Sequence, residues 1–158
     1  MWFFMILCYV FTLVSFCMLI LSGLQGYCGF MIFKATHATF AILTIIFYLF
    51  TETLIIFYFV GIGVSIKEYV LEKKLPLDYN QRSLKIKRNV YPPILFNILL
   101  MMALFISGGA VDTRHLPLWS HGLLFYGSLL HFLKVVLIQH RSFKEATELV
   151  LEMAGIKR

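Results

Sequence analysis

Four long apolar stretches divide the chain, at residues 2–24, 36–66, 92–107 and 120–139. A hydrocarbon core about 30 Å thick is crossed by roughly 20 apolar helical residues, so each stretch predicts a transmembrane helix, the third being short. The second would be about 45 Å long, and it must therefore tilt or protrude. We expect an all-α integral membrane protein, with residues 1–158 forming one domain built as a four-helix transmembrane bundle.

Two polar segments separate or follow these stretches. Residues 67–91 are rich in lysine and arginine, which predicts a basic loop outside the membrane. Pro92 and Pro93 then fit the first turn of the third helix. In the tail, residues 140–158, apolar side chains alternate with lysine and glutamate, which predicts a short interfacial amphipathic helix at the C-terminus.

The basic residues also predict an orientation. Lysine and arginine are frequent in residues 67–91 and 140–158, whereas the other two links hold one each, Lys34 and Arg114. Because such residues mark the cytoplasmic side, we expect both termini to be cytoplasmic in a bacterial inner membrane, or to face the matrix in a mitochondrial one. The first stretch has no basic leader or cleavage site, so we expect it to remain as a span.

Composition supports lipid as the solvent. The chain is 60% hydrophobic and 14% charged, whereas a soluble domain has about 25% charged residues. A soluble monomer is therefore excluded, and the net charge of +6 is interpreted as a topology signal and not as a nucleic-acid surface. Cys8, Cys17 and Cys28 form no CxxC pair, so neither a disulfide framework nor a zinc knuckle is expected.

The histidines suggest a cofactor. His37 begins the second apolar stretch and His121 the fourth, so both are expected at one depth on different helices. Such a pair can ligate the iron of haem b from its two sides. His115 is an alternative partner for either ring. With Asp112 added, the three histidines could instead form a small zinc or copper site.

Charged residues inside spans are rare and often functional. Glu52 and Lys134 lie at similar depth in the second and fourth stretches, so we expect an intramembrane ion pair. Alternatively, Lys134 extends to the membrane surface. Glu52 would then meet His131, and a carboxylate beside an imidazole suits a proton relay or a site for a quinone head group.

Three classes of function follow. The first is a small subunit of an electron-transfer or quinone-linked respiratory complex, with haem b or quinone as cofactor. The second is a cofactor-free accessory subunit that stabilises a larger membrane complex, and the third is an oligomer that conducts protons or ions. The predicted shape is similar to that of small cytochrome-b-type anchor subunits at the level of overall fold alone. We favour the first class, in which the chain is part of an oxidoreductase and not an enzyme by itself.

Overall fold

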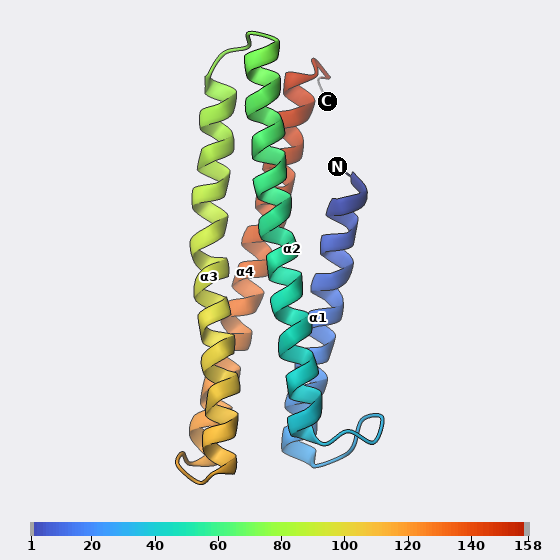
Figure 1. The fold of residues 1–158 in the computed structure, drawn as a ribbon, viewed down its shortest axis with the longest axis vertical. Helices are drawn as coiled ribbons and strands as arrows, with labels where there is room; N and C mark the ends of the chain where they lie inside the picture. Colours follow the sequence, from blue (N-terminus) through green and yellow to red (C-terminus); the bar gives the residue numbers. More distant parts are fainter. Residues whose placement is uncertain (1, 157–158) are drawn as a thin grey trace.

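The computed structural model describes residues 2–156 and consists of four helices. These are α1 (Trp2–Cys28), α2 (His37–Glu72), α3 (Asp78–Asp112) and α4 (Leu118–Met153). By length and composition, each is long and apolar enough to cross a membrane. The helices lie side by side with both chain termini at one end (Figure 1). This all-helical arrangement agrees with the predicted four-helix bundle.

Short connections hold successive helices together, whereas α1 and α4 touch only lightly. Gly29 follows α1 with a positive φ of 71°, a conformation that glycine adopts without strain, and its N–H donates to the Gln25 carbonyl at 2.9 Å. The Thr36 hydroxyl caps α2 by accepting from the Thr39 N–H at 3.5 Å. This connection brings His37, the first residue of α2, against Gly26 near the end of α1.

The basic segment at residues 67–91 is mostly helical. α2 continues to Glu72 and α3 begins at Asp78, so that Pro92 and Pro93 lie inside α3 and not in its first turn. The reason is packing, since Ile86 and Val90 are buried in the same cluster as Val70. An apolar face thus extends both helices beyond the length that lipid requires.

The C-terminal tail also differs from the prediction, because it continues the preceding helix. Residues 140–153 prolong α4 and do not form a separate surface helix. Phe143, Ala146 and Leu149 are at most 2% exposed and continue the buried face of α4. The Arg82 guanidinium also pairs with Glu152, at 2.9 Å between Nη2 and Oε2. This segment is therefore held against the other helices of the bundle.

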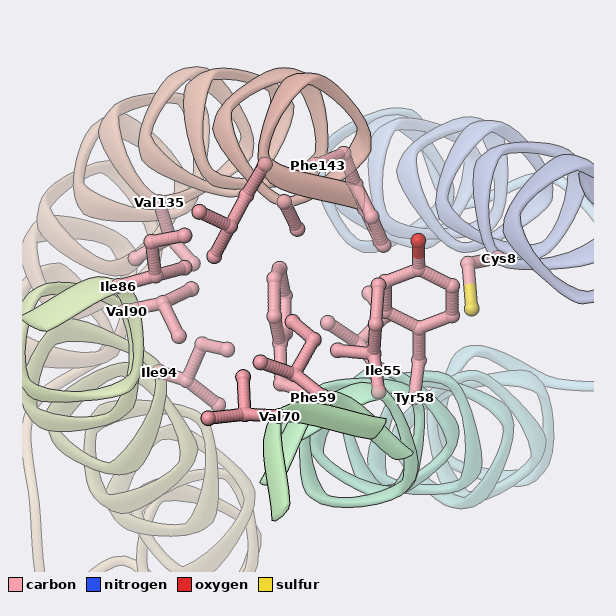
Figure 2. Close-up of a cluster of buried hydrophobic side chains, with 14 residues drawn as sticks. Cys8, Ile55, Tyr58, Phe59, Val70, Ile86, Val90, Ile94, Val135 and Phe143 are labelled. Carbon is pink, nitrogen blue, oxygen red and sulfur yellow. The ribbon is translucent and has the colours of Figure 1, made fainter. Parts of the chain in front are cut away.

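The apolar core has two parts. We call the end of the bundle near residues 73–77 the basic end and the end near His37 and His121 the histidine end. Figure 2 shows the larger cluster, toward the basic end, where side chains from all four helices point into one interior. The smaller cluster lies toward the histidine end and comprises Leu19, Tyr48, Met101, Leu104 and Phe132. Most polar contacts described below lie beside these two clusters.

Gly23 allows the light contact between α1 and α4, because a Cβ atom there would collide with the Phe125 ring. We expect Gly23→Leu to destabilise the bundle by about 1–3 kcal/mol through overpacking. Thermal unfolding in mild detergent measures this as a melting temperature lower by several degrees. Gly122→Leu is the matched control, since a Cβ at Gly122 meets nothing within 4 Å. Equal melting temperatures for the two variants would contradict this packing.

Candidate functional site

Glu52 lies fully buried in the bundle, at 0% exposure. The Gln139 side chain, also buried, donates from Nε2 to Glu52 Oε2 at 2.7 Å and so links α2 to α4. The other carboxyl oxygen, Oε1, is buried and has no hydrogen-bond partner within residues 2–156. One half of this carboxyl group is therefore satisfied, and the other half can hold a proton without losing a protein contact.

The expected ion pair between Glu52 and Lys134 does not form. Among residues 2–156, no carboxylate lies within 4.0 Å of the Lys134 ammonium, and Lys134 is exposed on the outside of α4. At 3.6 residues per turn, Lys134 and Gln139 are about 140° apart around the helix axis. Since Gln139 faces the interior, Lys134 faces outward.

His131 also has a partner other than Glu52. Buried Asn97 of α3 donates from Nδ2 to the Tyr48 hydroxyl at 2.6 Å, which leaves its Oδ1 to accept from His131 Nδ1 at 2.9 Å. Tyr48 and Asn97 are both 0% exposed. Tyr48 is one helical turn from Glu52 on α2, so Tyr48 and Asn97 stand between the two protonatable groups that the sequence suggested would touch.

This chain of hydrogen bonds fixes the His131 tautomer. With Nδ1 donating to Asn97, the neutral ring keeps its lone pair on Nε2. A carboxamide is not a titratable group, so Asn97 orients the imidazole and does not pass protons between Tyr48 and His131. Glu52 and His131 are therefore two separate proton-holding groups joined by an oriented, uncharged pair.

A groove of about 430 Å³ on the outside of α3 and α4 adjoins His131. Its walls include Phe96, Leu100 and Trp119, and the Phe96 ring meets the imidazole edge to face, with centroids 5.0 Å apart. Ser128 contributes a buried hydroxyl that has no hydrogen-bond partner within residues 2–156. Apolar walls with a few polar groups are typical of a site for a small, largely apolar ligand.

His37 and His121 both lie at the histidine end, His37 as the first residue of α2 and His121 in the first turn of α4. Each ring also packs against a glycine of the preceding helix. A Cβ atom added at Gly26 would lie 2.9 Å from His37 Cε1, and one added at Gly108 would lie 3.3 Å from His121 Cε1. Glycine thus lets both rings approach a helix backbone closely.

Hydrogen bonds at His121 suit a metal ligand. The Ser107 hydroxyl donates to the Leu104 carbonyl at 2.7 Å, so it accepts from His121 Nδ1 at 2.8 Å. Nε2 of the neutral ring then carries a free lone pair, which is the arrangement that most ligating histidines show. His37 Nδ1 is buried without a partner in the described part of the chain. Imidazole nitrogens without a protein partner are the kind of donor that haem iron accepts.

The proposed zinc or copper cluster does not converge. His115 is exposed and bonds to Thr113 Oγ1 at 2.9 Å. Within residues 2–156, no group of three or more histidine, cysteine, aspartate or glutamate side chains could hold a metal ion. Asp112 is the last residue of α3, and His115 lies in the exposed link that follows it.

The sequence analysis missed Gln139, Asn97, Tyr48 and Ser107, which make the hydrogen bonds of the site. A second polar pair, the Ser15 and Thr51 hydroxyls at 2.8 Å, links α1 to α2 beside Glu52. These uncharged residues carry a usable signal, because amide side chains inside apolar spans form interhelical hydrogen bonds. A search limited to charged residues and histidines passes over them.

We expect Gln139→Leu to destabilise the bundle, because it leaves Glu52 buried with no hydrogen-bond donor, at a cost of about 1–3 kcal/mol or more. The double variant Glu52→Leu with Gln139→Leu should recover most of the lost stability, since no buried polar group is then left without a hydrogen-bond partner. Thermal unfolding of all four proteins in mild detergent gives the coupling energy. Additive effects of the two substitutions would contradict this pairing.

Comparison with protein families, with curated proteins and with solved structures found no match to this chain. Its function is therefore argued from the chemistry of its own residues. The groups that carry chemistry are the His37–His121 pair, His131 with its groove, and the buried pair of Glu52 and Gln139.

Proposed function

We propose that this protein is a small integral-membrane subunit of an electron-transfer complex linked to quinone. The observation that carries the proposal is the chain Tyr48–Asn97–His131, which holds an imidazole in one tautomer at the edge of an apolar groove. A quinone head group is a flat ring with oxygen atoms at its edge, so it needs apolar walls and a proton-exchanging hydrogen-bond partner.

His131 supplies that partner in both redox states. The neutral imidazole accepts at Nε2 from a quinol hydroxyl, and the protonated imidazole donates from Nε2 to a quinone carbonyl. The ring could take one proton of the quinol at Nε2 and would have to release it before taking the second, and the reverse would hold for quinone reduction. Asn97 keeps Nδ1 bonded throughout, so exchange occurs at Nε2 alone.

Glu52 supplies a second proton-holding group deeper in the bundle. Its Oε1 is unpartnered and Tyr48 lies one turn away. A buried carboxyl group avoids a large solvation cost when it is neutral. We therefore assign Glu52 the role of a separate proton-holding group in the interior of the bundle, and Gln139 the role of fixing its orientation.

Haem b between His37 and His121 is the cofactor that we propose for the histidine end. Support comes from the position of both rings at one end of the bundle, on α2 and α4, from the free Nε2 of His121, and from the glycines under both rings. When bound, such a group exchanges single electrons. His121 and His131 are ten residues apart on α4, about 15 Å, so the electron and proton sites would share one helix.

We further propose that the basic end, which holds both termini, faces the cytoplasm or matrix. A larger complex would supply the electron donor or acceptor.

A cofactor-free accessory role is the second candidate. The buried contacts Glu52–Gln139 and Ser15–Thr51 favour it, because hydrogen bonds between spans hold helices together without any chemistry. In that case, the bundle would only stabilise a larger membrane complex. Binding experiments on the groove and the histidine pair separate the two roles.

The quinone site can be tested with Trp119, which lines the groove. Trp2→Phe leaves Trp119 as the sole tryptophan. We expect decylubiquinone to quench its fluorescence saturably in mild detergent, and His131→Ala to raise the half-quenching concentration about tenfold, the effect of one charge-assisted hydrogen bond. His140→Ala, at an exposed histidine, is the control. Unsaturable quenching of equal slope in all three proteins would remove the quinone proposal.

The haem assignment has its own test. The purified protein, reduced with dithionite, is expected to show the optical bands of haem b, and either His37→Ala or His121→Ala should abolish them. His115→Ala should leave them unchanged, because this histidine lies in an exposed link. Bands that survive both ligand variants would eliminate this ligand pair, and a colourless protein would favour the accessory role.

A further inference from the structure

Lys134 places a positive charge on the outside of α4, within an apolar segment. It is the only lysine, arginine, aspartate or glutamate between residues 115 and 140. Its side chain is exposed and has no carboxylate within 4.0 Å among residues 2–156. A lysine on a lipid-facing surface is costly unless it reaches water or meets a counter-charge.

Helix geometry works against an escape to water. Every Cα–Cβ bond in a helix tilts toward the helix N-terminus, which for α4 is the histidine end. The nearest polar surface along α4 begins at His140, about 9 Å away in the opposite direction. The Lys134 stem therefore starts toward the middle of the apolar segment, where a carboxylate on a neighbouring helix would neutralise its charge.

The face around Lys134 has the form of a helix-packing surface. Leu123, Leu130 and Leu137 follow each other at intervals of seven residues and are 67%, 67% and 61% exposed. Tyr126 and Leu133, also exposed, fall between them at intervals of three and four. This repeat, which we call the outer stripe of α4, is the spacing with which one helix packs along another. Lys134 lies along its edge, one turn from Leu130.

We propose that the outer stripe of α4 binds a transmembrane helix of a different protein, one that carries an aspartate or glutamate at the depth of Lys134. The charge excludes a second copy as the occupant. In the part of the chain that the structure describes, a second copy has no free carboxylate at the depth of Lys134 with which to neutralise it. Within residues 2–156, Glu52 is buried and bonded to Gln139, and the other acidic side chains lie at or near the helix ends. This inference rests on the subunit part of the proposed function and does not depend on quinone or haem.

Site-specific photocrosslinking in native membranes tests the proposal. A photoreactive amino acid at Leu130 should crosslink to one transmembrane segment of another protein, and that segment should hold a carboxylate within its apolar stretch. The same amino acid at Leu99, 63% exposed on α3, is the matched control and should label lipid. A Leu130 adduct with lipid alone, with a second copy, or with a segment lacking a carboxylate would overturn the proposal.

Charge exchange completes the test. Lys134→Glu should lower the crosslink yield by at least about tenfold, equal to 1.4 kcal/mol, whereas Lys134→Arg should preserve it. Replacing the partner's acidic residue with lysine should restore the yield in the Lys134→Glu background. An unchanged yield in Lys134→Leu would overturn the proposal. Trp119 quenching by decylubiquinone is measured separately on the Trp2→Phe protein with Lys134 unchanged, so that failure of docking and failure of the quinone site give different results.

Discussion

The arrangement of this protein depends on how little an apolar side chain gains by leaving lipid for the interior of a helix bundle. Lipid tails are as apolar as leucine, so helices in a membrane associate through close packing and polar contacts. The interior accordingly holds Ser15, Thr51, Asn97 and Gln139, all buried, while large apolar side chains cover the outside. Each inner contact joins two helices, and together they set the rotation of every helix about its axis.

The rotation of α4 about its axis decides which of its residues face the bundle and which face outward. His121, His131 and Gln139 face the bundle or its groove and make contacts with α3 or α2. Lys134, between them in sequence, faces outward. One helix thus carries a proposed electron site, a proposed proton site and a buried carboxyl contact on its inner side, and a proposed docking surface on its outer side.

In the polar contacts, the side chains that orient the site are different from the side chains that can exchange protons. Asn97 and Gln139 carry amides, which donate and accept hydrogen bonds in fixed directions, whereas Glu52 and His131 can gain or lose a proton. Each protonatable group is therefore held by one amide that does not titrate. The same design serves structure and chemistry, because an oriented group is both a stable interhelical link and a positioned proton carrier.

The sequence by itself determined the apolar environment, the number of spans and the end of the bundle at which His37 and His121 lie, because apolar length and antiparallel connection fix depth along the helices. It did not determine the partner of Glu52. Lys134 and Gln139 differ by five residues, a small change in depth but about 140° of rotation. Which of them faces Glu52 depends on how α4 is turned against α2, and only the tertiary structure decided this. The extension of α2, α3 and α4 beyond membrane length was decided there too, since it follows from the packing of Ile86, Val90 and Leu149 in one cluster.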